Sequence, residues 1–326
     1  MVAVASAGID TWSPCWYVER ESAAARAMEA LATSPSARGK LIPDEVDGHR
    51  VGWFPGPSLV YAEGHPGEGD ALGRPAQLED RCRSLEAAIL DLGVPLPRAR
   101  ARRGSALLET SDRPGLAGVR RLDVTVDVSC ERSEGLAMLA GVAALDSGQL
   151  DRDVRYNGSS IGTVSWVGRR GKVARVYDKG LESGSALRGT RIRLEAQYRW
   201  TRDSRREPSE LTAPYVRDKF LRRFRSLGAA ANGIKVVGKM KMRDGLMEAV
   251  ESGDLTMAQA EQVIAFQLFE AGGDRGRYSQ PTRWRRRQLV ERSGFVLADH
   301  LAEEVEMDLG AAFDVALEAD VWDREK

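Results

Sequence analysis

Alternating hydrophobic and polar positions mark the clearest strands of the chain. Residues 120–128, RRLDVTVDV, alternate strictly, which predicts a strand with one apolar and one polar face. The aromatic segment Gly8–Val18, GIDTWSPCWYV, is also strand-like. A hairpin with a Pro-Gly-Pro turn is predicted at 49–64. Two strands joined by a turn at 168–171 are predicted at 163–178, and a further strand is predicted at 191–200.

Helical spacing of apolar residues marks most of the other segments. Helices are predicted at 21–32, 77–92 and 133–145. From about residue 208 the pattern becomes helical, and two further helices are predicted at 255–269 and 283–291. The segment YVRDKFLRRFRSL is typical of an amphipathic helix, because it places one apolar stripe opposite its arginines. That stripe consists of Val216, Phe220, Phe224 and Leu227.

The strand–helix–hairpin order of the first hundred residues recurs after residue 120. We therefore predict an α+β fold with an antiparallel-rich sheet core built from two related α/β halves and a helical C-terminal part. The predicted domains are a core over 8–207 and a C-terminal part over 208–326, which carries basic helices and an acidic tail.

Composition restricts the setting in which the protein works. The chain has 326 residues, 42% of them hydrophobic and 29% charged, and its formal net charge is zero, so no global basic signature points to nucleic acid. Its three cysteines, Cys15, Cys82 and Cys130, form no metal-binding or disulfide pattern, which favours the cytoplasm. We expect no signal peptide, because the N-terminus MVAVASAGID has neither a basic region nor an adequate apolar stretch. We also expect no membrane span, because no run reaches the ~18 apolar residues that a span needs.

Three strands are each predicted to have a chemically unusual polar face. An ordinary solvated sheet face is the plain alternative for any one of them. Two carboxylates four residues apart in one strand repel each other unless a cation lies nearby, and such oxygen ligands suit Mg²⁺ or Mn²⁺. The polar faces comprise Asp123, Thr125 and Asp127 on the first strand, Arg175 and Tyr177 on the second, and Arg193, Glu195 and Gln197 on the third.

These segments also carry a family likeness. RLDVTVD, RVYDKGLE and RLEAQYR, in that order, resemble the signature of the Rep_trans replication initiation factors, which include plasmid rolling-circle initiators and relaxases of some integrative conjugative elements. The opening GIDTWS is similar to the start of that domain, and the resemblance covers about residues 8–227. It implies a protein that binds an origin and nicks one DNA strand. The products would be a covalent phosphotyrosine and a free 3′-hydroxyl for rolling-circle replication.

The resemblance also implies a role for each residue of the motifs. Tyr177 would be the nucleophile, with Arg175 and Lys179 beside the phosphate. Mg²⁺ or Mn²⁺ would be held by Asp123 and Glu195, with Asp127 as a further ligand. Glu182 receives no role. A metal site built on paired histidines is not expected, because His49, His65 and His300 form no pair and are predicted to lie in turns or on the surface.

Two arginine clusters in the C-terminal part predict a DNA-binding surface, for which a solvated helix face is the alternative. For the cluster around Trp284, contacts that clamp the C-terminal core are a further alternative. The predicted DNA-binding residues are Arg222, Arg223, Arg285, Arg286 and Arg287, the last three beside Trp284. The acidic tail from Glu303 to Glu325 is a candidate partner for the second cluster.

The expected partners are origin DNA with a single-stranded or cruciform nick site and a helicase or polymerase of the host. A homodimer is compatible with the sequence. The motifs do not separate replication from conjugative transfer. A non-enzymatic DNA-binding regulator on a similar scaffold is the rival function, and the convergence of Asp123, Glu195, Arg175 and Tyr177 on one face would discriminate the two.

Overall fold

The predicted α+β class is confirmed by a computed structural model of the chain. It describes residues 2–18, 20–36, 39–55, 59–67, 71–96, 116–145, 151–157, 160–168, 172–182, 187–201, 205–271, 278–297 and 306–318. Strands form a ten-stranded sheet, in the order β2-β3-β4-β5-β1-β6-β10-β9-β8-β7, and a three-stranded sheet, in the order β12-β11-β13. The tips of both predicted hairpins, at 56–58 and 169–171, lie outside the described residues.

The predicted repetition of the two halves is visible in the strand order. The first half comprises β1 (Ala3–Tyr17), α1 (Ala23–Leu31), β2 (Ser34–Ser36), β3 (Gly39–Leu41), β4 (His49–Phe54) and β5 (Leu59–Gly64). The second comprises β6 (Leu116–Ser129), α3 (Arg132–Ala144), β7 (Asp151–Asn157), β8 (Ser160–Gly168), β9 (Lys172–Asp178), the short α4 (Lys179–Glu182) and β10 (Arg191–Arg199). Each half is thus a strand, a helix and four further strands, the last of which lies beside the first. Helix α2 (Leu78–Asp91) follows the first half.

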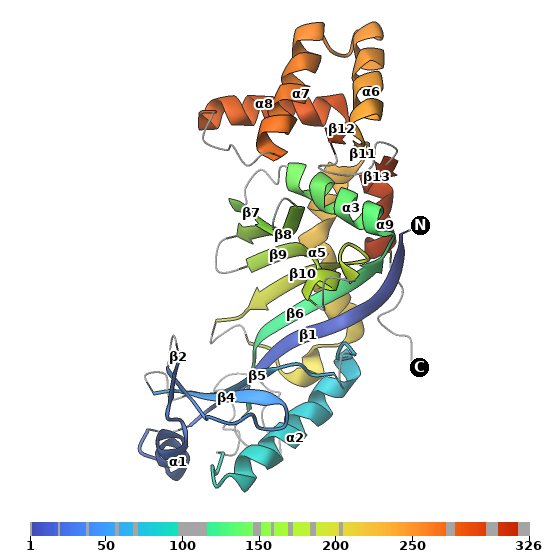
Figure 1. Cartoon of the computed structure of the whole chain (residues 1–326). Coiled ribbons are helices and arrows are strands. Elements are labelled where there is room, and N and C mark those ends of the chain that lie inside the picture. Colours follow the sequence, from blue (N-terminus) through green and yellow to red (C-terminus); the bar gives the residue numbers. More distant parts are fainter. Residues whose placement is uncertain are drawn as a thin grey trace, which may run out of the picture. The chain divides into compact units, whose positions relative to one another are not determined.

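The apolar faces of these elements form the core as the alternation predicts. Leu122 and Val124 of β6 are fully buried, as are Val126 and Val128. Helix α3 lies against β8 and β9 (Figure 1). Strand β7, which contains Tyr156 and pairs antiparallel with β8, was not among the predicted strands. The polar alternation of DRDVRYN is typical of an edge strand, and it was obscured by the glycines around it.

The C-terminal part contains more structure than the sequence indicates. It comprises α5 (Ala213–Ala231), β11 (Lys235–Val237), α6 (Lys239–Glu251), α7 (Met257–Ala271), α8 (Gln280–Ser293), β12 (Phe295–Leu297), β13 (Glu306–Asp308) and α9 (Leu309–Leu317). The predicted stripe of α5 is buried. Strand β11 pairs parallel with β12 and antiparallel with β13. Three-residue strands are too short to show a period, so the small sheet was not predicted.

Part of the predicted acidic tail forms an apolar helix, α9. This helix buries Phe313 completely. Within the described part of the tail, Glu306 pairs with Lys241 at 2.8 Å and with Lys235 at 3.7 Å, which are lysines outside the α8 cluster. Residues 298–305 and 319–326, which include both ends of the tail and His300 before it, lie outside the described residues.

Contacts divide the chain into two compact units that are not contiguous in sequence. One contains Met1–Ser6, Val126–Ala196 and Phe220–Val321, and the other contains Ala7–Thr125, Gln197–Lys219 and Trp322–Lys326. Neither unit begins or ends at residue 207 or 208. The division into a core over 8–207 and a C-terminal part over 208–326 stays a prediction. None of the described helices has the length and apolar character needed to cross a membrane.

His49 was predicted to lie in a turn or on the surface; instead it begins β4 and is buried. Its Nε2 accepts a hydrogen bond from Trp12 Nε1 at 2.9 Å, and its Nδ1 lies 2.7 Å from the carbonyl of Asp47. A ring that accepts at Nε2 and donates at Nδ1 is the neutral tautomer. Burial lowers the pKa of His49 accordingly.

This lowered pKa predicts a loss of stability in mild acid. Near pH 7.5 the imidazole is neutral in both the folded and the unfolded chain and contributes no pH dependence. As the pH falls through about 6.5, the unfolded chain takes up a proton that the folded chain resists, so the free energy of unfolding decreases. Urea unfolding at about pH 7.5 and 5 measures this. His49→Gln should show a smaller decrease than the wild type, and an equal decrease in the two proteins would contradict the assignment.

Candidate active site

Tyr177, Arg175 and Glu195 form one hydrogen-bonded cluster. Alternation along β9 places Arg175 and Tyr177 on the same face, as predicted, and the neighbouring strand β10 carries Glu195. The Tyr177 hydroxyl donates to Glu195 Oε2 at 3.2 Å, and Arg175 Nη1 donates to Glu195 Oε1 at 3.1 Å. The tyrosine and the arginine are therefore oriented by the two oxygens of a single carboxylate.

The members of this cluster differ in their access to solvent. The side chain of Glu195 is 5% exposed and Tyr177 is 8% exposed, whereas the side chain of Arg175 is 38% exposed. Solvent therefore reaches the cluster mainly at the side chain of Arg175.

Asp127 belongs to a separate buried ion network. Arg193 donates to both of its carboxylate oxygens, at 2.5 and 2.9 Å, and Arg191 and Ser6 also donate to Oδ2. Burial alone would raise the pKa of Asp127, but the guanidinium groups of Arg193 and Arg191 outweigh burial and hold the pKa below its usual value. Both carboxylate oxygens are thus engaged by protein donors.

Asp123 is held in a similar way by different groups. Arg121 donates to it from Nε at 3.1 Å and Nη2 at 2.5 Å, and Gln197 Nε2 donates at 3.2 Å. Arg121 also reaches Glu63 at 2.6 Å. Burial raises the pKa of Asp123 despite the neighbouring Arg121. The polar side of β6 is therefore buried, and the solvated-face alternative does not describe Asp123 or Asp127.

These contacts bear on the predicted Mg²⁺ or Mn²⁺ ion. Among the described residues, no group of three or more histidine, cysteine, aspartate or glutamate side chains is placed to hold a metal. The oxygens of Asp123, Asp127 and Glu195 accept hydrogen bonds from guanidinium, amide, hydroxyl or phenol groups instead. The described residues therefore offer no ready ligand set, and the metal stays a prediction.

The turn after Tyr177 is fixed by a residue that the sequence did not single out. Asp178 is buried, and its carboxylate accepts from the backbone amides of Leu181 at 3.1 Å and Gly189 at 2.9 Å. An aspartate at the end of a strand and just before a helix is a common cap, which is the signal that was available. Lys179 follows it as the first residue of α4 and is half-buried, and the side chain of Glu182 lies outside the described residues.

The five predicted DNA-binding arginines lie in different surroundings. Arg222 of α5 and Arg285 of α8 are exposed, whereas Arg223 is half-buried. Arg286 donates to the carbonyl of Gln262 at 3.3 Å, and its guanidinium carbon lies 5.6 Å from the centre of the Tyr278 ring. Arg287 lines a pocket. On the exposed face of α8, Arg285 accompanies Trp284, which is 58% exposed, and Arg292 two turns further on.

Comparison with known proteins does not assign the chain to a family. No protein-family model matches it, and no curated protein does. Among solved structures, the heterotetrameric sarcosine oxidase from Corynebacterium sp. U-96 in complex with pyrrole 2-carboxylate is 13% identical. That match covers 68% of this chain and 84% of the other, with a TM-score of 0.21. A likeness this weak carries no argument about fold or function.

Proposed function

We propose that the protein is a replication initiator that nicks and rejoins one DNA strand through Tyr177. The observation that supports this most is the contact between the Tyr177 hydroxyl and Glu195 Oε2 at 3.2 Å, with Arg175 on the other oxygen. A nucleophilic hydroxyl within reach of a base, which is oriented in turn by a third group, is the usual arrangement of covalent catalysis. Arg175 adds a cation where the phosphate would enter.

The chemistry follows from these three side chains. The Tyr177 oxygen attacks the scissile phosphorus as its proton passes to Glu195. The bond from phosphorus to the 3′ oxygen breaks, the 5′-phosphate stays on Tyr177, and Glu195 returns the proton to the 3′ oxygen. Arg175 offsets the charge that develops on the phosphoryl oxygens. The reverse sequence rejoins the strand, because the phosphotyrosine conserves the energy of the broken bond.

The exposed face of α8 is the DNA-binding surface in this proposal. Arg285 and Arg292 supply charge for phosphates, and Trp284, which adjoins Arg285 in the sequence, is a platform for an unpaired base. Arg222 extends the basic surface on α5. Arg286 acts instead within the protein, because it links α8 to the carbonyl of Gln262 and to the Tyr278 ring.

Arg285→Ala and Arg286→Ala are a matched pair that tests this division. Each removes one positive charge from the same helix, yet only Arg285 is expected to contact phosphate. Arg285→Ala should reduce the slope of log affinity against log salt by about one and leave the melting temperature unchanged. Arg286→Ala should lower the melting temperature and leave the slope nearly unchanged. Equal slopes in the two variants would show that α8 does not bind DNA in this way.

The proposal is tested with a library of supercoiled plasmids that carry the DNA flanking the gene. The protein is incubated with the plasmids in three separate reactions that contain Mg²⁺, Mn²⁺ or excess EDTA. At least one reaction should yield nicked DNA that is covalently linked to the protein, and peptide mapping should locate the attached nucleotide on Tyr177. Nicking that persists in EDTA would overturn the metal prediction alone. A nucleotide on any other tyrosine would overturn the choice of nucleophile.

A non-enzymatic DNA-binding regulator remains the rival function. The observation that favours it is that the acids of the polar strands are paired with arginines, as in a purely structural network. Sequence-specific binding without any adduct would establish it. In either case we place the protein in the cytoplasm, where its three unpaired cysteines would stay reduced. A host helicase or polymerase, and a second copy of the chain, are its proposed protein partners.

A further inference from the structure

The polar face that carries Tyr177 continues onto the last two strands of the large sheet, β8 and β7. Strand β8 pairs with β9 so that Thr163 lies opposite Tyr177 and Ser165 lies opposite Arg175. On the other side of β8, Arg155 of the edge strand β7 lies opposite Thr163. Residues that are opposite each other in a β-ladder share one face of the sheet. Tyr177, Thr163 and Arg155 therefore form a row across three strands.

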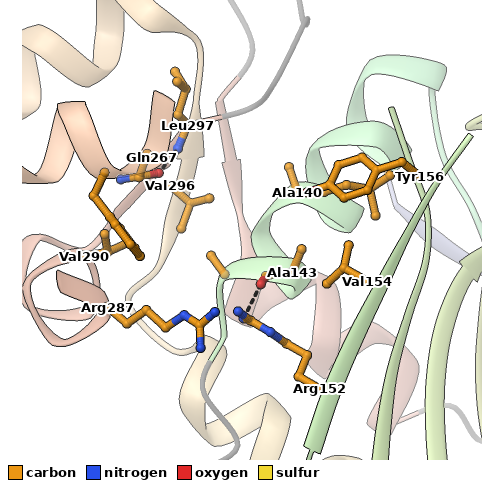
Figure 2. Close-up of a pocket in the computed structure, with 13 residues that line it drawn as sticks. Ala140, Ala143, Arg152, Val154, Tyr156, Gln267, Arg287, Val290, Val296 and Leu297 are labelled. Atoms are coloured by element: carbon orange, nitrogen blue, oxygen red, sulfur yellow. Dashed lines mark hydrogen bonds between the residues drawn. The ribbon is translucent and has the colours of Figure 1, made fainter. Parts of the chain in front are cut away.

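Strand β7 presents this polar face away from helix α3. Figure 2 shows Val154 and Tyr156 of β7 around a small pocket with Ala140 of α3, so these two side chains belong to the apolar face. Successive side chains of a strand point to opposite faces. Asp153 and Arg155 therefore lie on the polar face, which α3 does not cover.

Exposure along the row decreases from the edge of the sheet toward the nucleophile. The side chain of Arg155 is 79% exposed and that of Asp153 is 53% exposed. Thr163 is half-buried, and Tyr177 is 8% exposed. The polar face thus leads from open solvent at β7 to Tyr177.

Two hydroxyl groups on β8 have capacity for a ligand. Neither Thr163 nor Ser165 forms a side-chain hydrogen bond within the described part of the chain. Ser165 is only 9% exposed, and a polar group that is buried without a partner costs free energy. A ligand that accepts hydrogen bonds beside Tyr177 and Arg175 would remove that cost.

Arg155 supplies a cation at the open end of the row. Its pair with Asp153, at 3.0 Å, is exposed, and exposed ion pairs contribute little. An incoming anion can therefore replace the carboxylate of Asp153 at little cost. Arginine, serine and threonine side chains are common donors to the phosphates of nucleic acids. Arg155 lies two strand spacings, about 10 Å, from Tyr177, which matches a ligand with more than one phosphate.

We propose that the scissile DNA strand crosses this face as a single strand, from Tyr177 over β8 to the edge of the sheet at β7. Ser165 joins Arg175 in donating to the scissile phosphate. Thr163 and Arg155 hold the next phosphate along the strand. Because Tyr177 is nearly buried, the backbone must lie against the sheet, which a single strand can do and a rigid duplex cannot. The choice of DNA as the source of the phosphates rests on the proposed function.

The hydroxyl groups are tested with fluorescein-labelled oligothymidylate about ten nucleotides long, which is within the usual range of single-strand sites. Titrations use the Tyr177→Phe protein, so that no adduct traps the DNA. In this background Thr163→Val and Ser165→Ala each remove one hydroxyl and should weaken binding by about tenfold, the effect of one hydrogen bond to a charged group. Ser252→Ala is the matched control, because Ser252 is exposed at the end of α6 and its hydroxyl donates to Asp254.

The ion pair of β7 provides a test that damage to the fold cannot imitate. Arg155→Gln and Asp153→Asn break the same exposed pair, so they should change the melting temperature alike. Arg155→Gln should weaken binding and reduce the slope of log affinity against log salt by about 0.7, the value for one phosphate of a single strand. Asp153→Asn should instead strengthen binding by up to about fivefold, because the phosphate no longer competes with a carboxylate.

Several results would overturn the proposed path. These are no binding of the oligonucleotide, unchanged affinity in either hydroxyl variant, a change in the same direction in both β7 variants, or an equal loss of affinity for a duplex of the same length. Adduct formation by the wild type tests the nicking function separately. A protein that forms the adduct but shows none of these changes in affinity refutes the path alone. A protein that shows them but forms no adduct refutes the nicking function alone.

Discussion

Tyr177→Phe is expected to abolish the covalent protein–DNA adduct completely while leaving DNA affinity nearly unchanged. The substitution removes only the phenolic oxygen, which donates to Glu195 Oε2 at 3.2 Å. Without that oxygen no phosphotyrosine can form. The ring keeps its place beside Thr163, its partner across the β8–β9 pair, so the sheet should be preserved.

Two further variants separate chemistry from structure at this site. Glu195→Gln keeps a hydrogen-bond acceptor but removes the base, and should slow adduct formation by a factor of roughly 10² to 10⁴. Tyr215→Phe is the control, because Tyr215 lies on α5 with Lys219 4.8 Å from its ring centre and is not part of the cluster. Denaturing gels of protein bound to labelled DNA measure the adduct. A normal adduct in Tyr177→Phe would refute the assignment.

The faces of the central strands could be predicted because each strand is a regular alternation. In β6, β9 and β10 the period of two places apolar residues on the core side, so Arg175, Tyr177 and Glu195 could be assigned to polar faces. What alternation cannot give is which strands are neighbours. Glu195 meets Tyr177 because β10 returns beside β9, and that pairing depends on the whole sheet order.

The partners of the acids were missed for the same reason. Arg193 and Asp127 are 66 residues apart in the chain, yet they meet because β10 also lies beside β6. The alternation did place Arg193 on the polar side of its strand, which was the available signal. The sequence led us to expect that the polar face of β6 is either solvated or bound to a metal. In the structure its acids instead form buried ion pairs with arginines, and such pairs depend on tertiary contacts that no local pattern contains.

The largest expected effect on stability is that of Asp127→Asn. The variant keeps the shape of the side chain but removes the charge that faces Arg193, whose side chain is only 3% exposed. An unpaired buried cation costs about 3–5 kcal/mol of unfolding free energy. Asp153→Asn is the control, because its pair with Arg155 is exposed and should contribute less than about 1 kcal/mol.

The pH dependence of this loss identifies its cause. Because the pKa of Asp127 lies below its ordinary value in the folded chain, the stabilisation is present above the pKa of an unfolded aspartate, about 3.9, and is lost as the pH falls through the folded value. The difference between wild type and Asp127→Asn in urea unfolding should therefore be largest near neutral pH and shrink in acid. A difference that stays constant with pH would mean that shape, and not charge, makes Asp127 important. In that case Arg193 would be balanced chiefly by something other than this carboxylate.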